Sequence, residues 1–285
     1  MKYGIVSEGG GMRGAYTAGV LRWLLENDIN FDNASSISAT AVLMAYYVAE
    51  DKEALERLGV ELMSDKHNVG WRPVVRELQL LGYHYMFNNL IKKKVPLNIE
   101  NIRKSKTLMQ LGVYCKETHE LIWVDNKTFD DELKYLKATV LMPVAGRCPV
   151  IDGKHYMDGG VMTMMPIFHS MEFKNDRYFC ITTKHASYVR EPNGKFLSFV
   201  IDVLYHRYPR MRASIKDRVK TYYDEMGKID ELIKEGRGIL MRPSRLLPVS
   251  RLSASKEDLA ELYKLGYQDC EDRKEEIYKF MGKTR

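Results

Sequence analysis

The sequence predicts an α/β fold, in which helices cover both faces of a central sheet. Two strand–turn–helix units near the N-terminus support this class. An apolar segment at 3–7 meets a run of glycines before a helical pattern, and a small-residue segment at 33–38 precedes a second, apolar helix. Beyond Glu191 the sequence becomes mostly helical. We therefore expect a sheet-containing N-terminal part and a helical C-terminal extension.

The first unit consists of a strand, a glycine loop and a helix. Tyr3–Ser7 is short and apolar, which is typical of a buried strand that runs into a tight turn. A helix is expected over 13–26, where apolar residues recur at helical spacing: Tyr16, Val20, Leu21, Leu24 and Leu25. In the second unit, 33–38 forms the strand and 39–49 the helix, and helix-forming residues continue over 50–62.

Further strands and helices are expected along the rest of the chain. The expected strands lie at 111–114, 120–124 and 177–183, and a helix is expected at 129–139. Residues 150–157 resemble a hairpin, because Asp152-Gly153 is a favoured two-residue turn. Ser255 and Asp258 resemble a capping box, which predicts that a helix begins there. Residues 69–94 are rich in aromatic side chains and predict no single element.

The composition is that of an ordinary globular protein and argues against several functional classes. The chain has 285 residues and a net charge of +6, from 44 basic and 38 acidic side chains. This mild excess permits contact with an anionic lipid surface. No dense basic tract lies in a recognisable nucleic-acid-binding module, so we expect no nucleic-acid partner. The four cysteines are widely spaced, so we expect free thiols in a reducing compartment rather than disulfides or a zinc site.

The sequence shows neither a recognisable signal peptide nor a membrane-spanning segment. The first residues contain no apolar segment typical of a signal peptide. The longest apolar stretch, 41–49, is too short to cross a bilayer. We therefore expect a cytoplasmic protein, and the sequence does not indicate its oligomeric state.

A glycine loop, Gly9-Gly10-Gly11-Met12-Arg13-Gly14, is the first segment that could carry chemistry. Consecutive glycines let the backbone approach a ligand closely, and their N–H groups at the start of a helix point toward negative charge. Such a loop can hold a phosphate, stabilise a transition-state oxyanion or simply form a tight turn. The same residues also satisfy the dinucleotide-binding pattern, for which Asp32 could bind the ribose.

A serine and an aspartate lie in two further segments. Ser38 sits between a strand-like segment and a helix, which is the setting of a nucleophile elbow, although Ser36 and Thr40 stand where the usual pattern has glycine. Asp158 is followed by Gly159 and Gly160 directly after the expected hairpin. Taken alone, each segment is also compatible with an inert buried serine or an ordinary turn.

The order of these three segments resembles that of patatin-like phospholipases, over roughly residues 3–170. The glycine loop and the Asp-Gly-Gly block carry the resemblance, and other matching segments are Ala15–Leu21, Met142-Pro143, Val150–Gly153 and Pro166-Ile167. The resemblance implies a three-layer α/β/α fold with a central, mostly parallel sheet. It implies a catalytic domain over 1–172 and a mostly helical C-terminal extension over 173–285, packed on the same domain.

The resemblance also implies an activity, the hydrolysis of a lipid or another acyl ester. Ser38 would be the nucleophile and Asp158 its base, as a dyad that uses no histidine, cofactor or metal. The N–H groups of Gly10 and Gly11 would stabilise the oxyanion. Other residues would shape the site, namely Gly9, Arg13 and Gly14 in the loop, Ser36 and Thr40 in the elbow, and Gly159 and Gly160 after the aspartate.

Three alternatives stay open from the sequence alone. The chain could be a patatin-like protein that has lost catalysis and binds lipid or protein, or a dinucleotide-binding α/β protein. A Ser-His-Asp triad is a rival mechanism, although none of the seven histidines lies in a recognised motif. The basic run over 207–220 is either a solvated helix face or a contact for anionic headgroups, and Lys92–Lys94 is a shorter segment of the same kind.

Overall fold

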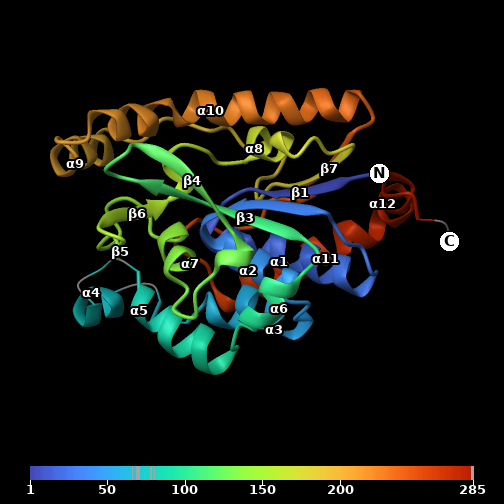
Figure 1. Ribbon diagram of the computed structural model, residues 1–285, viewed down its shortest axis with the longest axis horizontal. Coiled ribbons are helices and arrows are strands. Elements are labelled where there is room, and N and C mark those ends of the chain that lie inside the picture. The colour runs from blue at the N-terminus through green and yellow to red at the C-terminus, as the bar shows by residue number, and fades with distance from the viewer. Residues whose placement is uncertain (66, 69–70, 78, 80, 284–285) are drawn as a thin grey trace.

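The computed structural model describes residues 1–65, 67–68, 71–77, 79 and 81–283. In these residues, eight strands form one mixed, mostly parallel sheet, with the order β5-β6-β3-β2-β1-β7-β8 and with β4 paired to β3 outside this path. The strands are β1 (Tyr3–Ser7), β2 (Asn33–Ile37), β3 (Leu108–Cys115), β4 (Glu120–Asp125), β5 (Val150–Ile151), β6 (Lys154–Asp158), β7 (Arg177–Ile181) and β8 (Gly238–Met241). Helices lie above and below this sheet (Figure 1), so the predicted α/β fold is confirmed.

The helices vary widely in length. They are α1 (Gly14–Glu26), α2 (Ser38–Val48), α3 (Lys52–Glu56), α4 (Trp71–Glu77), α5 (Tyr83–Tyr85), α6 (Ile99–Lys104), α7 (Lys134–Thr139), α8 (Ile167–Glu172), α9 (Lys195–Leu204), α10 (Pro209–Lys234), α11 (Lys256–Asp272) and α12 (Lys274–Met281). Short 3₁₀ turns lie at Gly11–Arg13, Asn126–Thr128 and Gly159–Val161, and π-helical segments lie at Arg57–Leu62 and Met86–Lys94. None of the described helices is both long and apolar enough to span a lipid bilayer.

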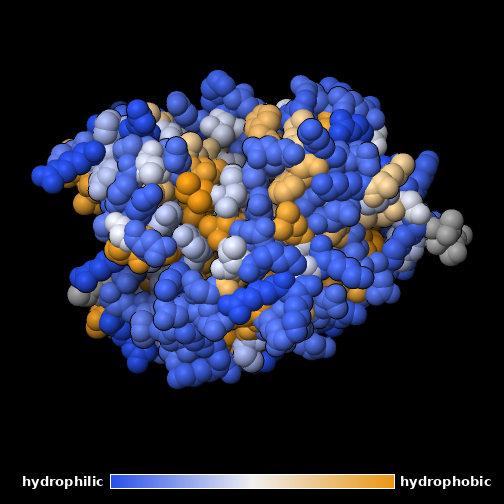
Figure 2. Space-filling view, in the orientation of Figure 1, coloured by the Kyte–Doolittle hydropathy of each residue, from blue (hydrophilic) through white to orange (hydrophobic). Residues whose placement is uncertain are grey.

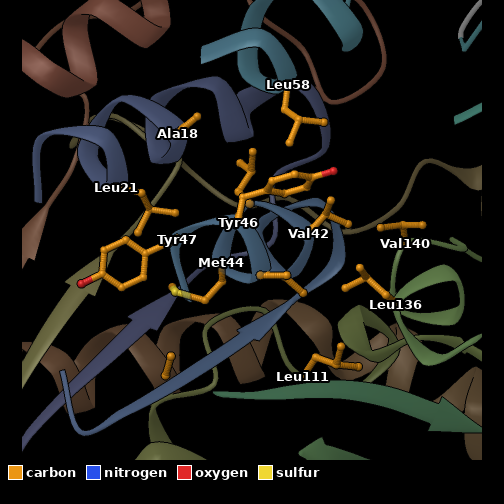
Figure 3. Packing of buried hydrophobic residues seen from close by; sticks show 14 of the residues in the cluster. Ala18, Leu21, Val42, Met44, Tyr46, Tyr47, Leu58, Leu111, Leu136 and Val140 are labelled. Carbon is orange, nitrogen blue, oxygen red and sulfur yellow. The ribbon is translucent and has the colours of Figure 1, made fainter. Parts of the chain in front are cut away.

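Helix α2 forms the centre of the core on one face of the sheet. All its residues from Thr40 to Val48 are buried, as expected for a helix that is apolar on every side. Figure 3 shows α2 between α1 and the sheet, with Tyr46 and Val42 reaching toward Leu58 and with Leu111 of β3 on the opposite side. A separate apolar cluster lies under α8 and α10 on the other face, and it includes Met165, Tyr178 and Ile229.

The strand arrangement directs two chain segments toward one point. Strand β2 pairs with the first part of β3 and ends at Ile37, opposite Gly112. Strand β6 pairs with the last part of β3, and its Asp158 lies opposite Val113. Strands β2 and β6 therefore meet nearly end to end along β3, and this brings the residues that follow Ile37 close to Asp158.

Several predicted elements are confirmed with small changes at their ends. The hairpin β5–β6 turns at Asp152 and Gly153, which both have positive φ (+49° and +77°), as a two-residue hairpin turn requires. The capping box at Ser255 and Asp258 starts α11. The four cysteines are unpaired.

Two helix predictions and one strand boundary need correction. The helix expected over 129–139 begins only at Lys134, because Leu133 takes a left-handed conformation (φ +57°) that a helix cannot contain. Residues 50–62 do not continue α2, since Glu50 also has positive φ (+60°) and separates α2 from α3. Strand β7 ends at Ile181 rather than at Thr183.

The C-terminal region contains a strand that the sequence analysis missed. Strand β8 pairs in parallel with β7 and extends the main sheet. Helix α11 packs along α1, close to the N-terminal strand–loop–helix unit. The division at residue 172 stays a prediction, and the region beyond it supplies two strands of the same sheet.

Candidate active site

Ser38 occupies a strained turn at the carboxyl end of β2. Its φ is +58°, in the left-handed region that non-glycine residues rarely adopt. The turn follows β2 directly and begins α2, and the Ser38 side chain remains partly exposed. Strain at one residue persists only where its surroundings enforce it, and it clusters at functional sites.

Two threonines hold this turn. The Ser38 N–H donates to Thr139 Oγ1 at 3.0 Å, and Thr139 Oγ1 in turn donates to the Gly112 carbonyl at 2.8 Å. Thr40 Oγ1 donates to the Ile37 carbonyl at 2.8 Å. The threonine at position 40, where the usual pattern has glycine, therefore bonds to the backbone of the turn.

Asp158 lies at the end of β6 and is buried, with 4% of its surface exposed. Its Oδ1 accepts the Gly160 N–H at 2.7 Å. Burial raises the pKa of the Asp158 carboxyl, and hydrogen bonds from the Gly160 N–H and the Ser38 side chain act in the opposite direction. A carboxylate with a raised pKa next to a serine hydroxyl is suited to accept a proton.

The glycine loop passes directly over the Ser38 turn. A Cβ on Gly9 would lie 3.0 Å from the Ser38 Cβ, and a Cβ on Gly10 would lie 2.7 Å from the Thr183 side chain. Gly11 has a φ of +57°, and a Cβ there would lie 2.4 Å from the Arg251 carbonyl. The close approach of three separate segments therefore explains why glycine occupies these positions.

The N–H groups of this loop fall into two sets. Gly9 N–H donates to the Met164 carbonyl at 3.2 Å, and Met12 N–H donates to the Arg251 carbonyl at 3.0 Å. Within the described part of the chain, the N–H groups of Gly10 and Gly11 have no backbone or side-chain acceptor. These two N–H groups are free to bind an oxygen of a ligand.

Arg13 and Gly14 fix the loop from its far end. Arg13 Nε donates to the Val249 carbonyl at 2.9 Å. Gly14 begins α1 close to α2, where a Cβ would lie 3.3 Å from the Leu43 side chain. Both residues thus hold the loop in place, and neither donates directly to the Ser38 side chain.

A buried ion pair supports the loop from below. Glu8 Oε1 lies 3.3 Å from Lys184 Nζ, and Glu8 also accepts the Thr183 N–H at 2.9 Å. Although burial raises the pKa of Glu8, Lys184 and the neighbouring donors hold it below its usual value. Burial lowers the pKa of Lys184 to about 8. The sequence analysis did not identify this pair, because its two members lie far apart in the chain.

Two cavities open on either side of Ser38. The first has a volume of about 110 Å³ and is lined mainly by apolar side chains, among them Val42, Leu90 and Met142. The second has a volume of about 220 Å³ and contains Asp158 together with several cationic side chains, namely Lys184, Arg190, Arg218 and Arg251. A ligand that contacts Ser38 could therefore extend into an apolar space and a cationic space.

Over the described ranges, the side chains that a Ser-His-Asp triad or a dinucleotide site would need do not lie at Ser38 or at the glycine loop. Among the residues that the structure describes, no histidine lines either cavity, and His155 pairs instead with Glu117 at 2.7 Å. Asp32 accepts the Tyr3 N–H at 2.6 Å, at the amino end of the strands and away from the glycine loop, so it cannot hold a ribose bound there. Across the described residues, no group of three or more potential ligands could hold a metal ion.

The fold and this site define an α/β protein whose strand–turn–serine unit, buried aspartate and glycine loop meet at one edge of the sheet. The chain belongs to the patatin-like phospholipase family, which it matches over residues 5–170. Residues 208–282 match a domain of unknown function, DUF6363. No curated protein sequence matches the chain.

Solved structures that resemble the chain include the following two. VipD from Legionella pneumophila is 14% identical with a TM-score of 0.52, and the match covers 95% of this chain and 66% of that chain. Human GIVD cytosolic phospholipase A2, in complex with a fluorophosphonate inhibitor, is 10% identical with a TM-score of 0.44, and the match covers 99% of this chain and 59% of that chain. The similarity to VipD supports the fold alone.

The structure brings together most of the residues singled out from the sequence. Ser38, Asp158 and the loop residues Gly9–Gly11 all line the second cavity. The sequence analysis missed the cationic residues of the second cavity. It also missed Thr139, whose hydroxyl binds the Ser38 N–H and which we call the clamp residue of the turn. Only Arg218 had a signal, because it lies in the basic run over 207–220, whose neighbours Arg212 and Lys220 pair with Asp202 and Asp224.

Proposed function

We propose that the protein hydrolyses acyl esters of lipids, with Ser38 as nucleophile and Asp158 as its base. One observation carries this proposal. The strained turn presents Ser38 at the point where β2 and β6 meet, beside a buried carboxylate whose pKa is raised by burial. Membership of the patatin-like phospholipase family agrees with the same chemistry.

The proposed reaction has two stages. Asp158 accepts the hydroxyl proton while Ser38 Oγ bonds to the ester carbonyl carbon, and the N–H groups of Gly10 and Gly11 bind the resulting oxyanion. The intermediate collapses, the alcohol leaves with the proton from Asp158, and the acyl group remains on Ser38. A water then attacks the acyl-enzyme and passes a proton to Asp158. As the new tetrahedral intermediate collapses, Asp158 returns this proton to the Ser38 oxygen and the carboxylic acid leaves.

The apolar cavity supports a lipid as the source of the acyl group. Its lining comes from α2 and from the π-helical segment at 86–94, with Leu43, Met86 and Leu90 among its side chains. An acyl chain would bury apolar surface against these side chains, at roughly 25 cal/mol per Å² removed from water. The cavity opens at Ser38, so the ester carbonyl would lie at the nucleophile.

Replacement of each dyad member tests the proposal. Ser38→Ala and Asp158→Asn should each lower the rate of hydrolysis of medium-chain p-nitrophenyl esters by about 10³-fold or more. The two residues of a catalytic dyad depend on each other, so the loss of either removes most of the catalytic effect. A fluorophosphonate probe should label the wild type and fail to label Ser38→Ala. Circular dichroism would establish that each variant is folded.

Two results would contradict the proposed dyad. Full activity in folded Ser38→Ala would rule out this serine as the nucleophile. A wild-type protein that neither hydrolyses acyl esters nor reacts with the probe would favour a patatin-like protein that has lost catalysis.

We also propose that α9 contacts the surface of a lipid membrane. Its outer side exposes large apolar side chains, with Phe196 82% and Phe199 66% exposed. Exposed basic residues flank them, namely Lys195, Arg207 and Arg210. Figure 2 shows hydrophobic residues at the left end of the molecule, where Figure 1 places α9. Apolar side chains within a cationic rim suit an anionic bilayer surface.

Co-sedimentation with vesicles tests this contact. The double variant Phe196→Ser/Phe199→Ser should lose binding to phosphatidylcholine vesicles that contain phosphatidylserine. The matched control is Phe168→Ser, which removes an exposed aromatic side chain from α8. Equal binding by all three proteins would show that α9 does not contact the membrane.

A further inference from the structure

The cationic side chains of the cavity beside Ser38 come from the region beyond the catalytic segments. Arg190 comes from the loop after β7, Arg218 from α10, and Arg251 from the loop before α11. Arg218 and Arg251 both lie beyond residue 170, outside the match to the patatin-like family, and both lie inside the C-terminal domain of unknown function. The C-terminal region thus supplies positive charge to a site whose nucleophile lies near the N-terminus.

The three guanidinium groups are held without carboxylate partners. Arg190 is 8% exposed and lies over the Tyr222 ring, 5.3 Å from its centroid. Arg218 Nε donates to the Met164 sulfur at 3.4 Å. None of the ion pairs found in the described residues includes any of the three arginines, whereas Lys184 is paired with Glu8. Charged groups gathered without counter-ions are unfavourable unless a ligand neutralises them.

Desolvation and the proximity of these arginines to one another lower the pKa values of Arg218 and Arg251. Burial, together with Arg251 and Arg190, lowers the pKa of Arg218 to about 9. Desolvation and Arg190 likewise lower the pKa of Arg251, although this residue remains exposed to solvent on one side. Asp158 is the one carboxylate in the lining of this cavity within the described chain. A single buried carboxylate leaves an excess of positive charge.

We infer that Arg190, Arg218 and Arg251 form a subsite for a phosphate group on the alcohol side of the ester. This inference rests on the proposed hydrolysis at Ser38 and names its substrate class. The substrate is an acyl ester that carries a phosphate, and a terminal phosphomonoester suits the site best, because it brings up to two negative charges and no cation. Guanidinium groups bind phosphate oxygens through paired, charge-assisted hydrogen bonds.

The position of the subsite agrees with this orientation. Ser38, Gly11, Met142 and Arg251 line both cavities. The acyl chain would extend from Ser38 into the apolar cavity, and the phosphate would lie in the cationic one. A neutral ester would leave the arginines without a counter-ion, and a cationic headgroup would approach three positive charges.

Two esters with the same acyl chain test the inference, namely 1-acylglycerol 3-phosphate and the matching 1-monoacylglycerol. The wild type should have a kcat/KM about tenfold or more higher for the phosphate ester, since several charge-assisted contacts are lost with the neutral one. Arg218→Gln should lower this ratio by about tenfold, and the ratio cancels any effect on Asp158, which serves both esters. The matched control is Lys220→Gln on the same helix, an exposed residue paired with Asp224; it should leave the ratio unchanged.

Equal kcat/KM values for the two esters in the wild type would overturn the inference. An equal fall for both esters in Arg218→Gln would do the same. An equal fall of the ratio in Lys220→Gln would show that the net charge of the helix, and not a subsite, determines the preference.

A binding measurement separates this inference from the proposed hydrolysis. Calorimetric titration of Ser38→Ala should give tighter binding of 1-acylglycerol 3-phosphate than of 1-monoacylglycerol, and the added change Arg218→Gln should remove the difference. That result would support the subsite even if the wild type hydrolysed neither ester. Inorganic phosphate that competed as well as the acylated ligand would overturn the assignment to a lipid, because the apolar cavity would then contribute nothing.

Discussion

At the scale of single residues, the Ser38 turn is held by the hydroxyl groups of Thr139 and Thr40. Thr139 accepts the Ser38 N–H and donates to the Gly112 carbonyl, so one hydroxyl ties the nucleophile to β3. Thr40 bonds to the Ile37 carbonyl on the other side of the turn. Because the Ser38 N–H is already bonded to Thr139, it is not free to bind a further oxygen, whereas the N–H groups of Gly10 and Gly11 are. The conformation of Ser38 is therefore held by partners that belong to other elements.

Thr139→Val tests this clamp. The change keeps the shape of the side chain but removes an acceptor and a donor, so a buried N–H and a carbonyl lose their partner at a cost of about 1–3 kcal/mol in unfolding free energy. We expect kcat for ester hydrolysis to fall by about tenfold or more, as a misplaced nucleophile does not attack efficiently. Thr139→Ser is the control, since it keeps the hydroxyl and should retain most of the activity. A valine variant with wild-type kcat would show that the clamp does not position Ser38.

The sequence predicted the residues of the site better than their supports. Ser38 and Asp158 stood out because each lies at the end of an expected strand. Their proximity was not predictable, because it depends on β2 and β6 pairing with successive parts of β3. Thr139 gave no signal, because its role arises only where α7 packs against the β3 backbone. Arg251 could not be predicted either, because it lies in a stretch without a motif and reaches the glycine loop only in the folded structure.

At the scale of elements, α10 connects the C-terminal region to the loop that follows Asp158. Glu225 of α10 accepts the N–H groups of Met164 (3.1 Å) and Met165 (2.9 Å) and also binds the Thr163 hydroxyl. The Met164 carbonyl in turn accepts the Gly9 N–H. One carboxylate thus supports the segment between the Asp-Gly-Gly block and the glycine loop.

The unfolding free energy should depend on pH through Glu225. Burial raises its pKa to about 7 in the folded protein, from 4.5 in an unfolded chain. Between these two values the folded state binds more protons, so the unfolding free energy falls as pH rises from about 4.5 to 7, by about 1.4 kcal/mol per unit of pKa shift. Chemical denaturation at pH 5 and pH 8 should show this fall in the wild type and a smaller fall in Glu225→Gln.

Glu231 provides the matched control for this measurement. It lies on the same helix, is exposed, and pairs with Lys228. Glu231→Gln should keep the pH dependence of the wild type. If Glu225→Gln shows the same dependence as the other two proteins, Glu225 is already ionised throughout this range.

Elements whose pattern depends on local geometry were predictable, and those set by tertiary pairing were not. The hairpin β5–β6 follows from its Asp152-Gly153 turn, and α11 from its capping box. Strand β8 is only four residues long and lies between long helices, so its identity depends on pairing with β7. The late start of α7 depends on the left-handed conformation of Leu133, which its side chain does not favour.

At the scale of the whole molecule, α11 packs tightly along α1 and joins the two ends of the chain. Glycines make this approach possible: a Cβ on Gly19 would lie 2.0 Å from the Tyr263 carbonyl, and a Cβ on Gly266 would lie 2.2 Å from the Tyr16 carbonyl. Buried Tyr16 also donates its hydroxyl to Asp269 at 3.0 Å. Because α1 begins at the glycine loop and α11 follows the loop that carries Arg251, this contact fixes both parts of the site relative to each other.

Gly266→Ala should therefore disturb the protein far more than an added methyl group ordinarily does. The new Cβ would push α11 away from the α1 backbone, and overpacking of this kind costs about 1–3 kcal/mol of unfolding free energy. Gly227→Ala is the matched control, because Gly227 lies in α10 with no atom within 4 Å of an added Cβ; there alanine should raise the unfolding free energy by about 0.5–1 kcal/mol through its better helix propensity. Denaturant titration of the two variants gives both values. If Gly266→Ala proved as stable as Gly227→Ala, the two helices would have room to separate without cost, and the close contact between α1 and α11 would not be what holds the C-terminal region against the site.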